Sequence, residues 1–324
     1  MRERSHPNGR VSQSVQRPVS LEPVIRVHAL RKTYGRTVAV DGVSFEVHQG
    51  EIFGLIGPNG AGKTTTMECV EGLRAPDSGA ITVLGLDPVR DVRALQERIG
   101  VQLQEAQLQK RITVREAVEL WASLYRSAVD GDRLLEQLGL TEKRDAWFMT
   151  LSGGQKQRLL IALALINDPE VVFLDELTTG LDPQARRAIW ELVRGIRARG
   201  KSVFLTTHLM EEAERLCDRV AIIDRGRLVD IGTPAELVRR HCPVATVVVV
   251  TDHAAALAAF EAMPDVASVT QAGRTFTIRG EAAGLVTQVI RCLAEHHVPV
   301  HDVRTEHPTL EDVFLELTGH AMRD

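Results

Sequence analysis

The chain has 324 residues, more than one hydrophobic core usually supports, so its length predicts two domains. Hydrophobic residues make up 44% and charged residues 25%, values typical of soluble globular proteins. The net charge of −4 and the aromatic content of 4% argue against a nucleic-acid-binding surface built on stacking side chains.

No segment of the sequence has the length and composition of a membrane anchor. The longest apolar runs, LLIALALI and VATVVVV, are far shorter than the ~18 residues that a spanning helix needs. The N-terminus also lacks the apolar segment of a signal peptide. We therefore expect any membrane role to come through a partner protein.

The N-terminal two thirds of the chain predict a disordered tail followed by an α/β domain. Residues 1–23 are polar and rich in Pro, Gly and Ser, as in disordered tails. Residues 24–240 alternate short strands with helices, and several strands are apolar throughout, as in a sheet covered on both faces. The predicted strands are residues 24–30, 42–47, 51–57, 80–85, 171–176, 202–207 and 219–224.

Residues 57–65, GPNGAGKTT, form the GxxxxGK[ST] phosphate loop between a predicted strand and a predicted helix, as the motif requires. The glycines allow backbone N–H groups to close around phosphates, Lys63 reaches the β and γ oxygens, and Thr64 offers its hydroxyl to Mg²⁺. A simple glycine turn is the alternative, which the flanking strand and helix disfavour. The loop consists of Gly57, Pro58, Asn59, Gly60, Ala61, Gly62, Lys63, Thr64 and Thr65.

Between residues 107 and 167 the strand patterns stop, so we expect a helical insertion. Its first helix begins at a capping box formed by Thr113 and Glu116. The apolar residues that follow at helical spacing are Val114, Ala117, Val118, Trp121, Leu124 and Tyr125.

The stretch 151–166, LSGGQKQRLLIALALI, predicts a buried helix with Ser152 as its N-cap. Gly153 and Gly154 in the first turn should each cost about 1 kcal/mol relative to alanine. The turn also carries Gln155 and Lys156 where acidic side chains would complement the helix dipole. We infer that this helix end is left open for an anion.

The segment VVFLDE, residues 171–176, delivers two carboxylates at the carboxyl end of a buried strand, where ligands bind in such sheets. Asp175 suits a Mg²⁺ partner through water, and Glu176 suits polarisation of an attacking water. Alone, such a pair is more often a helix cap or a solvated turn. With the phosphate loop it fits a kinase, a small GTPase, a helicase or a transport ATPase, although no guanine-reading NKxD is present.

Residues 241–324 predict a small ferredoxin-like accessory domain with the order β-α-β-β-α-β. A final helix in PTLEDVFLELTG would place an apolar face on its own domain or on a partner chain. That face is formed by Leu310, Val313, Phe314 and Leu317. The other predicted elements are strand 245–251, helix 254–263, strands 266–270 and 274–279, helix 284–297 and strand 299–304.

Neither the cysteines nor the histidines form a clear functional pattern. The four cysteines lie far apart and form no CxxC pair, which fits reduced cytosolic thiols better than a disulfide framework. His296, His297 and His301 invite a metal interpretation, but their loose spacing favours a solvated surface.

Residues 24–237 resemble the nucleotide-binding subunit of an ABC transporter, and LSGGQKQR is that family's signature. The resemblance implies a P-loop NTPase fold of the ABC type with a helical insertion, and ATP hydrolysis with Mg²⁺. It also implies that Ser152, Gly153 and Gly154, with Gln155 beside them, bind the γ-phosphate of ATP held on another subunit's loop. The glycines would let the positive end of the helix approach that phosphate, so the active unit would be a dimer.

The resemblance assigns four further residues one at a time. Tyr34 matches the aromatic residue that stacks on adenine, or is an ordinary strand-edge tyrosine. Gln104 matches the glutamine that touches Mg²⁺ and leads into the helical insertion, with Gln102 as the rival if the register is off by two. Asp182 matches the loop that meets the opposite subunit, or simply caps the next helix. His208 matches the residue that contacts the γ-phosphate.

One position departs from the family pattern. The family usually has proline after the catalytic glutamate, and here Leu177 stands there. Without proline's fixed backbone angle, the path from Glu176 to Asp182 is expected to be looser, which affects the rate of hydrolysis rather than binding.

The C-terminal segment is similar to the ATPases of daunorubicin-resistance-type exporters and their lipid-exporting relatives. This implies export of a drug, antibiotic or lipid through a separate permease that docks on the helical insertion. The subunit would then be cytoplasmic, peripheral to the inner face of the membrane, and would bind no nucleic acid. Two alternatives stay open: a soluble ABC ATPase acting on ribosomes or DNA, and a regulatory subunit with little turnover.

Overall fold

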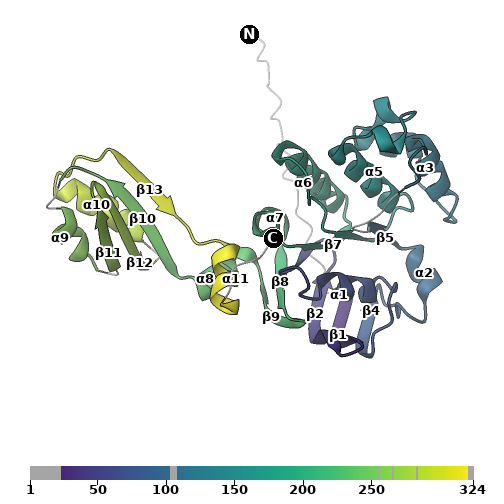
Figure 1. Ribbon diagram of the computed structural model, residues 1–324, viewed down its shortest axis with the longest axis horizontal. Coiled ribbons are helices and arrows are strands. Elements are labelled where there is room, and N and C mark those ends of the chain that lie inside the picture. The colour runs from purple at the N-terminus through teal and green to yellow at the C-terminus, as the bar shows by residue number, and fades with distance from the viewer. Residues whose placement is uncertain (1–22, 103–107, 254–255, 265, 282–283, 320–324) are drawn as a thin grey trace, which may run out of the picture.

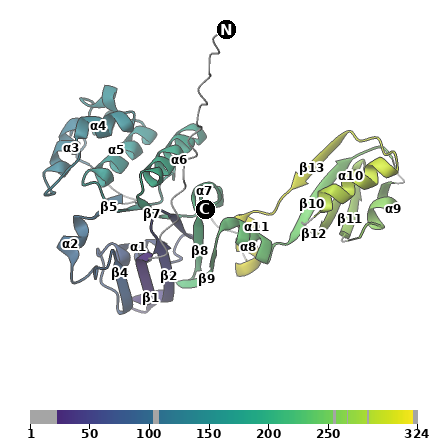
Figure 2. The same cartoon turned by 180° about the vertical axis from the view of Figure 1, so that it is seen from behind.

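The protein is elongated, with a larger body at one end and a small body at the other, as Figures 1 and 2 show from opposite sides. Residues 1–22 of the predicted tail lie outside the described residues, as does Gln104. Pro23, the last residue of the predicted tail, begins the first strand. This structure is a computed structural model, and it describes residues 23–102, 108–253, 256–264, 266–281 and 284–319.

A six-stranded sheet forms the centre of the larger body. Its strands are β3 (Ile52–Ile56), β5 (Ile99–Gln102), β6 (Val171–Asp175), β7 (Ser202–Thr207), β8 (Arg219–Asp224) and β9 (Arg227–Gly232). Their order is β5-β6-β7-β3-β8-β9, parallel except for β9. Every residue of β3, β6 and β7 is buried, so these strands are covered on both faces as expected. Two strands were not predicted: β5, which has only four residues, and β9, an edge strand that is mostly not buried.

An antiparallel sheet packs against the central one. It has the order β2-β1-β4. Phe45 stacks on Phe53 of the central sheet with 5.4 Å between ring centroids, and Phe204 contacts both rings. This aromatic cluster lies in the core that joins the two sheets. The strands are β1 (Pro23–Tyr34), β2 (Thr37–His48) and β4 (Ser78–Val83), with helices α1 (Lys63–Val70) and α2 (Val92–Gln96) nearby.

The helical insertion is present as a separate group of helices. The Thr113 hydroxyl accepts a hydrogen bond from the Glu116 N–H at 3.2 Å, and the Glu116 carboxylate accepts one from the Thr113 N–H at 2.8 Å. The predicted capping box is thus confirmed, but Leu124 lies beyond the helix end and is 65% exposed. The helices are α3 (Val114–Ala122), α4 (Gly131–Gln137) and α5 (Gly153–Leu165), with 3₁₀ turns at Thr141–Lys143 and Phe148–Thr150.

The small body has the predicted β-α-β-β-α-β order. Its four strands are antiparallel, in the order β11-β12-β10-β13. Phe260 and Phe276 meet edge to face in its core, with ring centroids 5.6 Å apart. Its elements are β10 (Val244–Val250), α9 (Ala256–Glu261), β11 (Val266–Ala272), β12 (Thr275–Glu281), α10 (Leu285–Glu295) and β13 (Asp302–Glu306).

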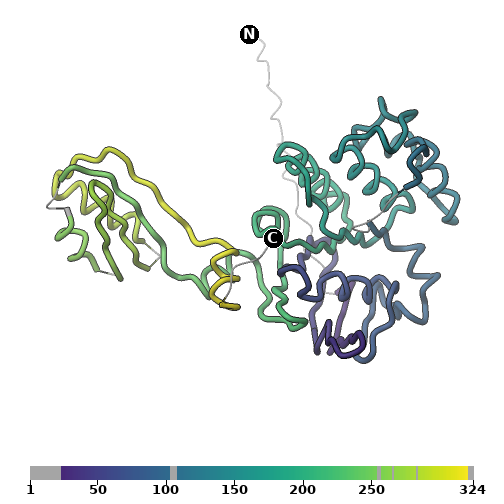
Figure 3. Tube along the Cα trace, in the orientation of Figure 1, coloured from purple at the N-terminus to yellow at the C-terminus, as the bar shows by residue number. Residues whose placement is uncertain are grey.

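The last helix, α11 (Leu310–Thr318), returns to the larger body, as the chain trace in Figure 3 shows. Leu310, Val313 and Phe314 are fully buried, in the hydrophobic core of the larger body. They pack where α7 (Met210–Leu216) and α8 (Pro234–His241) meet. The prediction placed this helix with the accessory domain. Its apolar face instead covers the neighbouring helices of the larger body, which also includes α6 (Pro183–Ala198).

The described residues contain neither a disulfide nor a membrane-spanning helix. All four cysteines are free thiols. Within the described ranges, no helix is both long enough and apolar enough to cross a membrane.

Candidate functional site

The phosphate loop connects β3 to α1 and is packed tightly against neighbouring strands. A Cβ atom on Gly57 would lie 2.1 Å from the carbonyl oxygen of Ile223, and one on Gly62 would lie 2.4 Å from that of Ala39. Gly62 also has a φ of +101°, which favours glycine. No larger residue fits at these two positions, and the loop ends at the start of α1, where the helix dipole favours an anion.

Lys63 is held inside the loop at 4% exposure. Its ammonium donates hydrogen bonds to the carbonyl oxygens of Gly57 and Pro58 at 2.9 and 3.1 Å, and its Nζ lies 3.8 Å from Glu176 Oε1. Burial lowers the pKa of Lys63, and the carboxylates of Glu176 and Asp175 oppose that shift. The lysine is therefore fixed beside both acidic residues that the sequence analysis selected.

Asp175 ends β6 and is 4% exposed. Thr206, its cross-strand neighbour in β7, donates its hydroxyl to the Asp175 carboxylate. Burial raises the pKa of Asp175, and hydrogen bonds from Thr206 and Thr64 lower it. One carboxylate with two hydroxyl groups is an all-oxygen donor set, which fits Mg²⁺. Thr206 was not predicted as a site residue, although it lies near the end of the predicted strand 202–207.

Glu176 follows Asp175 with a φ of +46°, an unusual conformation for a residue other than glycine. Its N–H donates to the carbonyl and hydroxyl oxygens of Thr206, both at 3.2 Å. Its Oε1 lies 3.8 Å from Lys63 Nζ and 3.5 Å from His208 Nδ1. The structure thus brings Lys63, Glu176 and His208 together, with the Glu176 carboxylate between the two nitrogen-containing side chains.

Ser152 is the N-cap of α5 and forms a full capping box with Gln155. Its hydroxyl accepts from the Gln155 N–H at 3.3 Å, and the Gln155 side-chain oxygen accepts from the Ser152 N–H at 2.9 Å. This S-x-x-Q capping box was not predicted, since Gln155 was considered only as a position without an acidic side chain. Within its own chain, Gln155 stabilises the helix end.

The two glycines in this turn have a packing role that the sequence did not reveal. A Cβ atom on Gly153 would lie 3.3 Å from Leu181 Cδ2, and one on Gly154 would lie 3.1 Å from Ala185 Cβ. Larger residues would therefore press on the start of α6. In Figures 1 and 2, α5 stands among the helices of the insertion and α1 beside the sheets, so the two helix ends belong to different parts of the molecule.

Asp182 is the N-cap of α6. Its carboxylate accepts hydrogen bonds from the N–H groups of Gln184 and Ala185, both at 2.9 Å. The capping alternative therefore applies within this chain, whether or not the residue also meets a second subunit.

The turn between Glu176 and Asp182 is packed into the larger body. Leu177 is 1% exposed and packs in the core of the larger body. Thr178 is fully buried, and its hydroxyl donates to Glu212 Oε1 at 2.8 Å. Both residues thus contact the larger body at the place where the family usually has proline, and the effect of Leu177 on hydrolysis stays a prediction.

Of the remaining predicted ligands, the structure describes Tyr34 but not Gln104. Tyr34 ends β1 and is 41% exposed, with Arg74 Cζ 5.2 Å and Lys32 Nζ 5.9 Å from its ring centroid. Gln104 lies outside the described residues. Its rival Gln102 ends β5 and is 3% exposed.

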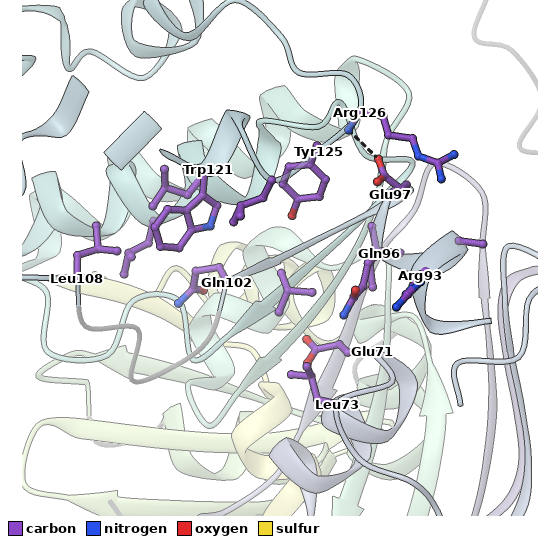
Figure 4. A pocket seen from close by; sticks show the side chains of 16 residues that line it. Glu71, Leu73, Arg93, Gln96, Glu97, Gln102, Leu108, Trp121, Tyr125 and Arg126 are labelled. Carbon is purple, nitrogen blue, oxygen red and sulfur yellow. Dashed lines mark hydrogen bonds between the residues drawn. The ribbon is translucent and has the colours of Figure 1, made fainter. Parts of the chain in front are cut away.

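A pocket of about 880 Å³ lies between the sheets and the helical insertion (Figure 4). Glu71, the C-cap residue of α1, lines it, so the pocket is at the opposite end of that helix from Lys63. The lining also includes Gln102 and the apolar side chains of Leu73, Ile99, Leu108, Trp121, Leu124 and Tyr125.

The carboxyl group of Glu71 lies buried in this pocket, and the residue is 3% exposed. Burial raises its pKa to about 8, and the charges of Asp175 and Glu68 add to the shift. Its Oε1 has no hydrogen-bond partner among the described residues. At neutral pH the Glu71 side chain is therefore mostly protonated.

His296 and His301, which the sequence analysis considered as metal ligands, contact neighbouring groups of the small body. His301 Nε2 lies 2.7 Å from Asp252 Oδ2, and His296 Nδ1 lies 3.0 Å from the Cys292 carbonyl oxygen. In the part of the chain that the structure describes, no three His, Cys, Asp or Glu residues are placed to hold a metal ion together. The candidate Mg²⁺ site at Asp175 is not such a cluster, because it has a single carboxylate and its other oxygen groups are hydroxyls.

The sequence matches the ABC transporter family over residues 40–179. It is 42% identical over 311 residues to Nod factor export ATP-binding protein I of Ralstonia nicotianae, covering 93% of this chain and 96% of that protein. The protein of the same name from Rhizobium meliloti is 39% identical over 317 residues, covering 95% of this chain and 92% of the relative.

Solved structures show the same fold. An ATP-binding subunit of an ABC transporter is similar with a TM-score of 0.61 and 30% identity, covering 67% of this chain and 92% of its own. An ATP-binding cassette solved as a dimer in a post-hydrolysis state with ADP and Pi has a TM-score of 0.59 and 27% identity, covering 64% and 98%.

Proposed function

The chain belongs to the ATP-binding proteins of the ABC transporter family, and on that premise we propose that it powers export through a permease carried on a separate chain. Members of this family bind ATP with Mg²⁺, hydrolyse it, dimerise and work with a transmembrane component. The protein is accordingly an ATPase subunit of a transport system. Its proposed location is the inner face of the membrane, where it would be held by the permease.

We propose a drug, an antibiotic or a lipid as the cargo, in line with the resemblance to daunorubicin-resistance-type exporters. The observation that carries export is the likeness to relatives named for Nod factor export over 93% of this chain. That likeness extends past the matched residues 40–179 and into the small body. An ATP-binding core alone would not distinguish export from import.

For hydrolysis, we assign Glu176 as the group that polarises the attacking water and accepts its proton. Lys63 and His208 would contact the γ-phosphate and stabilise its developing charge. The support is geometric, because both nitrogen side chains lie within 4 Å of the same Glu176 oxygen.

For binding, we assign the loop 57–65 to the phosphates and Tyr34 to the adenine ring. Thr64 and Asp175, with Gln104, would hold Mg²⁺, which supplies charge neutralisation at the β and γ oxygens when bound. The buried, hydroxyl-bonded Asp175 carboxylate supports the first two of these ligands.

We propose that two copies form the complete site. Ser152, Gly153 and Gly154 at the start of α5 would bind the γ-phosphate of ATP held by the other copy, and Asp182 would lie at the contact. The helix end has no acidic residue in its first turn, so its positive dipole end is not neutralised locally. Gln155 would hold Ser152 in place through the capping box.

The pocket beside α3 is the proposed docking site for the permease. Its apolar lining, with Leu124 65% and Trp121 partly exposed, suits an amphipathic helix of a partner chain. The pocket also lies at the end of β5, whose last residue is two positions before Gln104 in the sequence.

Co-expression with a candidate permease chain tests the proposal. We expect the two chains to copurify in detergent and ATP hydrolysis to rise when the permease is present. Leu124→Asp should abolish copurification. Ile290→Asp, at the similarly exposed position in α10, should retain it. Equal binding by the two variants would remove the pocket from the docking surface.

Deletion of the gene tests the cargo. A strain without it should become sensitive to a drug or antibiotic, or accumulate the lipid that the system exports. Unchanged export and unchanged sensitivity across these compounds would contradict the proposed cargo class.

A further inference from the structure

One buried carboxylate, that of Glu212 in α7, joins two other segments of the larger body. Its Oε1 accepts hydrogen bonds from the Thr178 hydroxyl at 2.8 Å and from the Trp190 indole N–H at 3.0 Å. Glu212 is 1% exposed, Thr178 is fully buried and Trp190 is 4% exposed. The three groups therefore interact without competition from solvent.

Two arms of this network lead directly to the catalytic cluster. Thr178 stands two residues after Glu176, in the packed turn that follows β6. Glu212 stands four residues after His208. It lies in α7, which begins at Met210, two residues beyond the histidine. The hydrogen bond between Thr178 and Glu212 is thus a short tether between the segment that carries Glu176 and the segment that carries His208.

The third arm leads to the proposed dimer contact. Trp190 lies in α6, which begins at its N-cap Asp182. A helix transmits displacement along its axis as a rigid element, so fixing Trp190 also fixes the start of α6. One acceptor oxygen therefore connects the segments that carry Glu176, His208 and Asp182.

The second carboxylate oxygen of Glu212 indicates a role other than stabilising the fold. Its Oε2 is buried with no hydrogen-bond partner among the described residues, which is costly for a carboxyl group. An apolar side chain there would leave the buried Thr178 hydroxyl and Trp190 indole N–H without their acceptor. Retaining an acid here therefore suits a residue that is needed for its acceptor geometry.

We propose that Glu212 is a positioning residue for ATP hydrolysis, which fixes Glu176 against His208 through Thr178 and fixes α6 through Trp190. The proposal rests on the proposed roles of Glu176 and His208. Glu212 would not touch the nucleotide, so its loss should affect turnover rather than ATP binding.

Steady-state kinetics on the purified full chain tests this inference. Glu212→Leu removes the acceptor and should lower kcat by about tenfold or more while leaving KM for ATP within about twofold. Glu212→Gln keeps an acceptor oxygen and should stay within about threefold of the parent. Thr178→Val should resemble Glu212→Leu, and the double variant should be no worse than either single one.

Val193→Ala is the matched control, since it weakens the same helix one turn beyond Trp190 without touching the network. It should lower the melting temperature but not kcat. A parental kcat in Glu212→Leu, an equal loss in Glu212→Gln, or a loss that Val193→Ala reproduces would overturn the proposal. Glu176→Gln is measured in parallel: if it alone loses turnover, the catalytic assignment stands and only the positioning role fails.

Discussion

At the scale of single residues, Glu176 has the clearest chemical prediction. Glutamine keeps its shape but cannot accept a proton, so Glu176→Gln should lower ATP turnover about 10²-fold or more. ATP binding should persist, and a dimer loaded with ATP should accumulate. Phosphate release and light scattering in Mg-ATP measure the two effects. Lys63→Ala should instead lose nucleotide affinity, and a parental rate in Glu176→Gln would contradict the assignment.

Glu71 gives a prediction that depends on pH. Its pKa is about 8 in the folded protein against an ordinary value of 4.5, so the folded state retains a proton that the unfolded chain loses. The free energy of unfolding therefore falls as pH rises from about 5 to about 8. Glu71→Gln lacks this effect and should gain stability relative to the parent across that range.

Thermal melts at about pH 5.5 and about pH 8.5 measure this difference. Glu119→Gln, an exposed acid on α3, is the control and should shift the melting temperature equally at both values. A difference between Glu71→Gln and the parent that does not grow with pH would show that the buried carboxyl does not titrate in this range.

Some of these residues could be selected from the sequence and others could not. Lys63, Asp175 and Glu176 belong to motifs with fixed spacing, so the chain order was enough to find them. Thr206 and Glu212 act through cross-strand pairing and burial. Those relations join residues distant in the chain, and only the folded structure supplies them.

At the scale of elements, two helices begin with the same kind of capping box but differ in their proposed surroundings. Ser152→Ala at α5 and Thr233→Ala at α8 each remove a hydroxyl acceptor and should cost about 1 kcal/mol in unfolding free energy. Only Ser152→Ala should also weaken dimerisation with Mg-ATP, because Ser152 is proposed to contact the γ-phosphate.

Chemical denaturation gives the stability cost, and sedimentation of both variants in a Glu176→Gln background gives the dimer affinity. Thr233→Ala controls for destabilisation alone. If both variants dimerise as tightly as their Glu176→Gln parent, the start of α5 is not part of a shared site.

Element prediction succeeded where the local pattern and the tertiary environment agree. The apolar strands β3, β6 and β7 and the capping box of α3 were all found. The strands β5 and β9 were missed because one is short and the other lies at an edge. The apolar face of α11 was recognised, but its partner could not be, since amphipathicity shows only that a face is covered.

At the scale of the whole molecule, α11 ties the chain's two bodies together. Phe314→Ala creates a cavity in the core of the larger body and should lower its unfolding free energy by about 3–5 kcal/mol. Hydrogen exchange in α7 should accelerate and ATP turnover should fall at elevated temperature. We expect these effects because α7 packs on α11 and begins two residues after His208.

Phe276→Ala is the matched control, since it makes the same truncation in the core of the small body. It should destabilise that body while leaving exchange in α7 unchanged. Equal exchange rates in α7 for the two variants would show that α11 does not support the ATPase core.

The return of α11 also fixes when the larger body can finish folding. During synthesis on the ribosome, α7 and α8 emerge well before the segment that covers them, because the whole small body is translated in between. A nascent chain halted there would present uncovered apolar side chains, the kind of surface to which chaperones bind. Translation of α11 is thus the event that ends this exposure.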